Sequence, residues 1–293
     1  MTDNSNENDL KARKFYGAGE ETRFAEQVPE RTPQTAHPAY KLAFRDTDFL
    51  LREELRPIRF QLELQKPEML LDEARVGSTL VIYGSARIPS PAQAEALLEA
   101  AKEKSEYEQK VAHRLAEKAK YYDEAYRLAR IVSEKAIIEG GKRQFVTTGG
   151  GPSIMEAGNR GASDAGSESI GLNIVLPHEQ APNSFVTPYL SFQFHYFALR
   201  KMHFLLRARA VAVFPGGFGT FDEFFELLTL IQTGKMKPIP ILLFGRDFWT
   251  RVIDFEALAE EGTISKGDLD LFRWCETADE AWAHIRAFYE LKD

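Results

Sequence analysis

The feature that most constrains the fold is an alternation, from residue 79 onward, of short apolar runs with longer segments of helical periodicity. The first run, Thr79–Tyr83, is apolar and β-branched and stops at Gly84, as a buried parallel strand ending in a tight turn does. Strands that alternate with helices are typical of a parallel sheet covered by helices. The sequence therefore predicts an α/β fold with a doubly wound parallel sheet.

The same pattern locates the individual elements along the chain. Strands are expected at Thr79–Tyr83, Gln144–Thr148, Ser169–Leu176, Ala210–Phe214, Ile239–Phe244 and Leu271–Cys275. Helices are expected as one long stretch from Pro91 to Glu139 and then at Ile154–Ala165, Phe197–Arg207, Phe221–Thr233 and Phe248–Glu260. A last helix begins at Thr277, which has capping-box spacing to Glu280.

Composition divides the 293 residues into three parts. Residues 1–39 are rich in Asn, Glu, Thr and Pro and predict a flexible polar tail. Residues 40–75 supply apolar side chains interrupted by Pro57 and Pro67, which indicates a helical extension. Residues 76–293 carry the strand–helix alternation and are expected to form the functional domain.

Charge and cysteine content exclude several classes of protein. The chain has 37 basic and 44 acidic side chains, a net charge of −7, which argues against a nucleic-acid-binding surface. Cys275 is alone, the six histidines lack metal-ligand spacing, and no apolar run approaches the roughly 18 residues of a membrane span. We therefore expect a cytoplasmic protein with no metal, no cofactor and no membrane or nucleic-acid partner.

Small residues follow two of the expected strands. Gly84 and Ser85 come directly after the first, with Arg87 close behind, and Gly149, Gly150 and Gly151 follow the second. Ligands of open parallel sheets bind beyond the carboxyl ends of the strands. Pro152 disfavours a flexible connection, so an ordered loop that leads into a helix and presents backbone N–H groups to an anion is expected.

The third loop, after Ala210–Phe214, carries the strongest signal. It reads Pro215-Gly216-Gly217-Phe218-Gly219-Thr220 and again leads into a helix, with the Thr220 hydroxyl at the helix start. Two such anion sites suggest a nucleotide or sugar-phosphate ligand.

Three charged residues near these loops have more than one interpretation. Glu223 has capping-box spacing to Thr220, so the spacing alone leaves a structural and a catalytic role open. The N-terminal dipole of the helix is expected to keep the Glu223 carboxylate ionised. Arg200 and Lys201 are either a solvated basic step or a clamp for phosphate or substrate.

Two of these motifs resemble those of a known family. Gly149 to Glu156 is similar to a GGG-x-x-G/I-M loop, and Pro215 to Glu223 match PGG-x-GT-x-x-E. Together they resemble the LONELY GUY (LOG) family of cytokinin riboside 5′-monophosphate phosphoribohydrolases, whose members have often carried the label "possible lysine decarboxylase". The resemblance covers the chain from Val76 to its end.

The resemblance implies a Rossmann-like fold, a homo-oligomer, and hydrolysis of a nucleoside 5′-monophosphate to free base and ribose 5-phosphate. It implies that Glu223 and Arg200 are catalytic, and that the glycine loops, Lys201 and Thr220 bind substrate or phosphate. The N-terminal extension and the residues before Arg200, which are not the family's usual M-H-x, are similar to a longer bacterial branch. AMP or another common nucleotide is therefore as suitable a substrate as a cytokinin precursor.

Two other functions are compatible with the same sequence. A protein of this fold could bind or sense nucleotides without catalysis. A decarboxylase would instead require a lysine that forms a Schiff base with pyridoxal phosphate, and Lys201 is the only lysine near the expected site.

Overall fold

The computed structural model describes residues 15–27, 30–135, 143–177 and 181–291. The chain divides into two compact units, residues 1–62 and 63–293. In the smaller unit, short helices lie at α1 (Ala18–Glu26), α2 (Pro33–Ala36) and α3 (Thr47–Leu50). Helix α4 (Arg56–Glu73) crosses the division. Within the described ranges, no helix is long and apolar enough to cross a membrane.

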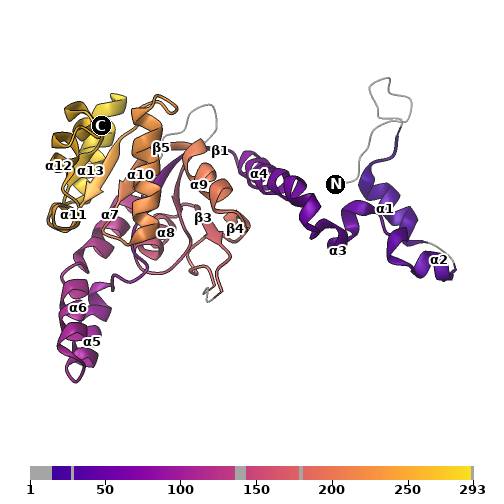
Figure 1. Ribbon diagram of the computed structural model, residues 1–293, viewed down its shortest axis with the longest axis horizontal. Coiled ribbons are helices and arrows are strands. Elements are labelled where there is room, and N and C mark those ends of the chain that lie inside the picture. Colours follow the sequence, from indigo (N-terminus) through magenta and orange to yellow (C-terminus); the bar gives the residue numbers. More distant parts are fainter. Residues whose placement is uncertain (1–14, 28–29, 136–142, 178–180, 292–293) are drawn as a thin grey trace. The chain divides into compact units, whose positions relative to one another are not determined.

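The larger unit contains a sheet of seven parallel strands in the order β4-β3-β2-β1-β5-β6-β7 (Figure 1). The strands are β1 (Val76–Tyr83), β2 (Arg143–Thr148), β3 (Ser169–Ile174), β4 (Ser191–Phe194), β5 (Ala208–Val213), β6 (Ile241–Phe244) and β7 (Arg273–Cys275). The chain builds outward from β1 to β4 and then returns to the other side of β1 with β5. The doubly wound parallel sheet expected from the sequence is confirmed.

The helices that follow β1 are α5 (Pro91–Ala101), α6 (Glu106–Ala116), α7 (Lys120–Glu134), α8 (Ile154–Asp164), α9 (Phe197–Leu206), α10 (Phe218–Gln232), α11 (Arg246–Val252), α12 (Phe255–Glu260) and α13 (Ala278–Tyr289). Helices cover both faces of the sheet, whereas α5 and α6 project away from it (Figure 1). Ile82 is buried in one core with α7, α8 and α13, whereas the Tyr83 ring contacts Phe204 of α9. Because successive strand residues point to opposite faces, α9 lies on the other side of the sheet.

Two expectations for the elements are wrong in detail, and one strand was missed. The single helix expected from Pro91 to Glu139 is three helices; Ser105, with Glu108 as its capping-box partner, caps α6 and accounts for the break between α5 and α6, and residues 136–139 lie outside the described residues. The helix expected at Phe248–Glu260 is divided into α11 and α12 by Asp254, whose carboxylate caps α12. Strand β4 was not predicted.

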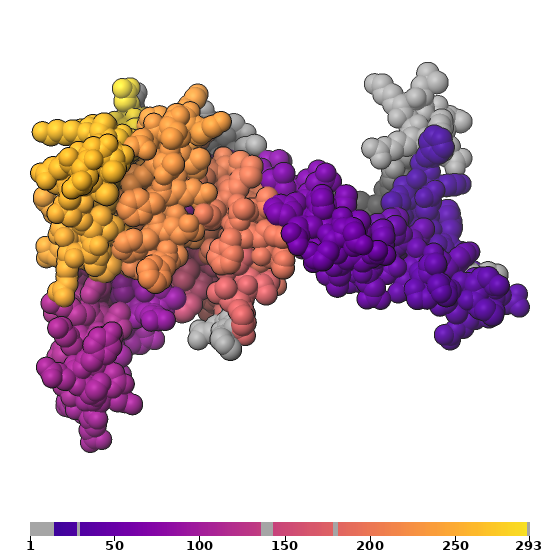
Figure 2. Space-filling view, in the orientation of Figure 1, coloured from indigo at the N-terminus to yellow at the C-terminus, as the bar shows by residue number. Residues whose placement is uncertain are grey.

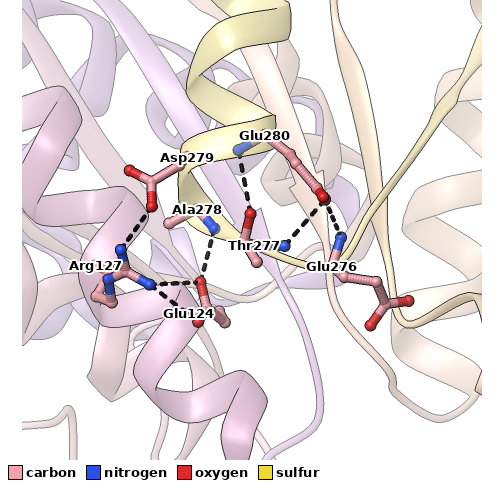
Figure 3. A network of polar contacts seen from close by, with 7 residues as sticks. All are labelled: Glu124, Arg127, Glu276, Thr277, Ala278, Asp279 and Glu280. Carbon is pink, nitrogen blue, oxygen red and sulfur yellow. Dashed lines mark hydrogen bonds and ion pairs between the residues drawn. The ribbon is translucent and has the colours of Figure 1, made fainter.

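The last helix begins as its capping box predicts (Figure 3). The Glu280 N–H donates to the Thr277 hydroxyl at 3.3 Å, and the Thr277 N–H donates to the Glu280 carboxylate at 3.2 Å. Glu124 of α7 accepts a hydrogen bond from the Ala278 N–H at 2.7 Å and pairs with Arg127 at 3.2 Å. Polar contacts therefore fasten α13 to α7 at the edge of the core.

The C-terminal half of α4 is fastened to α9. The two carboxylate oxygens of Glu63 accept hydrogen bonds from the backbone N–H groups of His195 and Tyr196, at 2.8 and 3.2 Å, directly before α9 begins. At the other end of α9, Arg207 pairs with Glu68 at 2.9 Å. Helix α4 thus holds α9 at both of its ends.

Helices α7 and α8 approach so closely that one position requires glycine. A Cβ atom on Gly161 of α8 would lie 2.2 Å from the carbonyl oxygen of Tyr126 in α7. That distance is far inside van der Waals contact and involves backbone, which cannot rotate away.

We expect Gly161→Ala to lower the free energy of unfolding by about 1–3 kcal/mol, the usual cost of overpacking a core. Urea denaturation followed by circular dichroism measures this. Gly19→Ala is the matched control, because a Cβ there meets nothing within 4 Å. An unchanged urea midpoint for Gly161→Ala would contradict the close α7–α8 contact.

Candidate active site

The site lies at the carboxyl edge of the sheet, where the strand order reverses between β1 and β5. The loops after these two strands touch, because the Ser85 N–H donates to the Pro215 carbonyl at 3.1 Å. In doubly wound sheets this reversal opens a crevice in which ligands bind. Ser85, Pro215, Gly216 and Gly217 line one cavity of about 500 Å³ here.

A buried ion pair lies near the same edge of the sheet, beside Gly149, and neither of its two residues is among those that line this cavity. The Arg200 guanidinium of α9 contacts the Glu223 carboxylate of α10 at 3.1 Å, and each side chain is only 12% exposed. The two residues that the resemblance marks as catalytic are therefore brought together, although 23 positions separate them in the chain. A nearly dry carboxylate–guanidinium pair interacts much more strongly than one in water.

The Arg200 side chain is fixed from three sides. Its Nε donates to the Leu172 carbonyl of β3 at 2.7 Å, and the guanidinium carbon lies 5.0 Å from the centre of the Phe204 ring. A Cβ atom on Gly149 would lie 2.7 Å from Nη2. The glycine after β2 therefore makes room for the guanidinium, a role that the glycine pattern alone did not indicate.

Glu223 does not cap its helix. Helix α10 begins at Phe218 with Gly217 as its N-cap, three residues earlier than expected, so Thr220 is already inside the first turn. The capping-box interpretation is wrong for this reason. Thr220 instead packs against Gly216, where an added Cβ would lie 2.2 Å from the threonine hydroxyl.

Burial determines the charge state of Glu223. Removal from water raises its pKa to about 7, and the Arg200 charge only partly opposes this. This differs from the expectation that the helix dipole keeps Glu223 ionised, because with a pKa of about 7 both forms are populated near neutral pH. A carboxyl group tuned to this range is typical of catalytic acids and bases.

The loop at Gly149–Gly151 is ordered by hydrogen bonds. Gly150 has a φ of 74°, and its N–H donates to the Thr148 hydroxyl at 2.9 Å. The Asn183 side-chain amide donates to the carbonyls of Gly150 and Gly151, at 3.1 and 2.9 Å. The Gly150 amide is thus used within the loop. By contrast, a Cβ atom added at Gly217 or Gly219 would meet no described atom within 4 Å beyond the neighbouring residues and the backbone of the same helix, so the space in front of this helix start is open.

Lys201 points to acidic partners. Its ammonium pairs with Asp222 at 3.1 Å and with Glu226 at 3.2 Å. Burial opposes protonation, but the hydrogen bonds to these two carboxylates outweigh it and raise the pKa of Lys201. Gly84, for its part, packs on Ile154, which a Cβ would approach to 2.5 Å.

Sequence reasoning missed two asparagines that build the site. Asn159 of α8 is fully buried and accepts hydrogen bonds from the Thr148 hydroxyl at 2.7 Å and from the Asn183 amide at 3.0 Å. Its place on the apolar side of an expected helix was the available signal, because a buried amide there requires partners. Asn183 lies in an irregular segment, where the sequence pattern gave no such signal.

Fold and site together define a doubly wound α/β protein with a buried carboxylate–guanidinium pair beside the glycine loop after β2. The model of a family described as "Possible lysine decarboxylase" matches residues 155–285. The chain is 26% identical over 151 residues to the cytokinin riboside 5′-monophosphate phosphoribohydrolase LOG2 of Arabidopsis thaliana, which covers 50% of this chain and 67% of the relative. These matches support the assignment of the chain to the LOG family.

Two solved structures match most of the chain at low sequence identity. The structural-genomics protein TM1055 has 19% identity and a TM-score of 0.44, covering 72% of this chain and 99% of its own. The Moco carrier protein from Chlamydomonas reinhardtii has 18% identity and a TM-score of 0.41, covering 73% and 99%.

We expect Arg200→Gln to raise the pKa of Glu223 above 7, because the guanidinium is the main group that favours the ionised carboxylate. Carboxyl-carbon NMR of protein labelled in its glutamates measures this titration. Lys237→Gln, at the opposite edge of the sheet, is the control and should leave the titration in place. A Glu223 pKa that does not rise in Arg200→Gln would contradict the contact.

Proposed function

We propose that the protein hydrolyses the N-glycosidic bond of a nucleoside 5′-monophosphate and releases free base and ribose 5-phosphate. The observation that carries the proposal is the buried Glu223, held by Arg200, whose guanidinium lies against Gly149 of the glycine loop after β2. The LOG family assignment implies a nucleotide phosphoribohydrolase, and the LOG2 relative supports this class of reaction.

The proposed mechanism uses the ionised form of Glu223. Cleavage of the bond between the base and the anomeric carbon places positive charge on the ribose ring, which a nearby carboxylate stabilises. Glu223 also accepts a proton from the attacking water, whose oxygen bonds to the anomeric carbon. The base leaves with the bonding electron pair and is protonated, so the atoms of one water are shared between the two products.

Arg200 positions this carboxylate. Its bonds to the Leu172 carbonyl and to Glu223 fix the distance between β3 and α10 at the site. By favouring the ionised form it also keeps the pKa of Glu223 from rising further. Arg200 thus supports both the geometry and the charge of the base.

The start of α10 is the proposed phosphate site. Gly216 and Gly217 come directly before a helix of 15 residues, with the crevice open in front of them. Unpaired backbone N–H groups and the dipole of a helix N-terminus favour an anion. Ser85 lines the same cavity and offers a hydroxyl. A 5′-phosphate bound here fixes the sugar before the bond breaks.

The decarboxylase description does not fit Lys201. A Schiff base forms from a neutral amine, whereas the Asp222 and Glu226 carboxylates hold this ammonium protonated. The resemblance also leads us to propose a homo-oligomer. It leaves open whether the preferred base is adenine, a modified adenine or a pyrimidine.

We expect Glu223→Gln to abolish base release while nucleotide binding persists, because the amide can neither accept the proton nor carry negative charge. A panel of nucleoside monophosphates, including AMP and a cytokinin riboside monophosphate, is assayed by chromatography of the free base. Glu226→Gln, one turn away on α10, is the matched control and retains turnover. If Glu223→Gln turns over normally, the assignment fails; if wild-type protein binds nucleotides but releases no base, the protein is a binding or sensing protein.

We expect kcat/KM to rise about tenfold per pH unit up to pH 7 and then to level off. The value of kcat/KM rises with pH because the ionised fraction of Glu223, which is the active form in this mechanism, grows as the pH rises through its pKa. The profile is measured at constant ionic strength. A rate that falls above pH 7 would assign the active role to the protonated form.

A further inference from the structure

The cavity at the strand-order reversal extends beyond the glycine loop into a region lined by both cationic and apolar side chains. Its walls include five cationic side chains: Arg87, Lys110, Arg114, Lys118 and Arg251. They come from separate elements, the loop after β1, helix α6 and the turn that follows it, and helix α11. We call this region the α6 basic cavity. Helix α6 belongs to the helical pair that projects beside α7 (Figures 1 and 2).

Among the described residues, carboxylates balance the charge of the α6 basic cavity only in part. Among the described residues that line it, none is Asp or Glu. Arg114 pairs with Glu117 at 3.0 Å, but the ion pairs of the described residues include none to Arg87, Lys110 or Arg251. These cations line one cavity although the net charge of the whole chain is −7.

The cations are also held near one another. Burial lowers the pKa of Lys118, and the charges of Arg114 and Arg251 lower it further, although Glu117 opposes them. The Lys118 ammonium lies 5.8 Å from the centre of the Phe248 ring. Like charges crowded at one cavity weaken the folded protein unless an anion joins them.

The combined positive charge of the five cationic side chains is larger than the negative charge of one bound phosphate group. A phosphate monoester carries roughly −1.5 to −2 near neutral pH, and the start of α10 already provides backbone N–H groups for it. The cavity of about 500 Å³ is continuous from Ser85, Gly216 and Gly217 to the α6 and α11 cations. A chain of phosphates that begins at the glycine loop would run toward these cations.

We propose that the α6 basic cavity binds the second and third phosphates of a nucleoside polyphosphate whose first phosphate lies at the Gly216–Gly217 loop. This rests on the proposed function for the position of the first phosphate. A nucleoside di- or triphosphate is then either a substrate, losing its base to water as the monophosphate does, or a ligand that occupies the same loop without cleavage. The shared chemistry is a chain of two or three phosphates.

The test compares the affinities of ATP, AMP and inorganic tripolyphosphate by isothermal titration calorimetry with the full-length chain. We expect ATP to bind about tenfold or more tightly than AMP, equivalent to about 1.4 kcal/mol. The double variant Lys110→Gln/Arg251→Gln should lose this advantage and its affinity for tripolyphosphate, while AMP binding changes less than about twofold.

The control removes the same number of charges elsewhere. Lys235→Gln/Lys237→Gln lies after the C-terminal end of α10, at the amino edge of the sheet, and both lysines are exposed. It should bind all three compounds as wild type does. Circular dichroism confirms that both double variants are folded. Equal affinity of wild type for AMP and ATP, or an equal loss in the control, overturns the proposal.

A second measurement distinguishes the two possible roles of the nucleoside polyphosphate, as a substrate or as a ligand that is not cleaved. Release of adenine from ATP by wild type, weakened in Lys110→Gln/Arg251→Gln, supports a polyphosphate substrate. Competition by ATP against AMP turnover, without adenine from ATP, supports an uncleaved ligand in the same cavity. If no nucleotide loses its base, the proposed hydrolysis fails, and the calorimetric comparison still decides whether the α6 basic cavity binds polyphosphate.

Discussion

The buried ion pair between Arg200 and Glu223 is the contact on which the rest of the site depends. Two charges removed from water are costly, and their attraction repays this only when the geometry is good and further hydrogen bonds are present. The Leu172 carbonyl supplies such a bond, and Gly149 leaves room for the guanidinium. The residual desolvation leaves Glu223 with a pKa of about 7, which a surface carboxylate would not have.

The parallel sheet explains why residues so distant in sequence meet. Leu172 belongs to β3, Gly149 follows β2, and Glu223 lies one turn into the helix after β5. Parallel strands place their carboxyl ends at one edge, so each contributes a loop or carbonyl to the same crevice. The asparagine contacts around Thr148 and Gly150 then keep the loop after β2 rigid.

The sequence was sufficient to predict the parallel sheet, but not its shortest outer strand or the breaks between consecutive helices. Apolar β-branched runs locate β1, β2 and β5, because strands covered on both faces exclude polar residues. Strand β4 was missed since it is only four residues long and half exposed along one side. The break before α6 had a usable signal, the spacing of Ser105 and Glu108, which the helical periodicity on either side obscured.

The candidate site was predictable only in part. Glycine loops indicate an anion site by local chemistry, and the structure adds an open helix start at Gly217. The pairing of Arg200 with Glu223 is a tertiary contact that no local spacing encodes, and only the family resemblance suggested it.

The contact of Glu63 with the start of α9 has a practical consequence: a chain shortened to begin at Val76, where the strand pattern starts, would retain the whole sheet and both members of the ion pair. It would nevertheless lose the carboxylate that closes the N-terminal end of the helix bearing Arg200, so the part needed for a well-ordered site begins upstream of the part that looks like the domain.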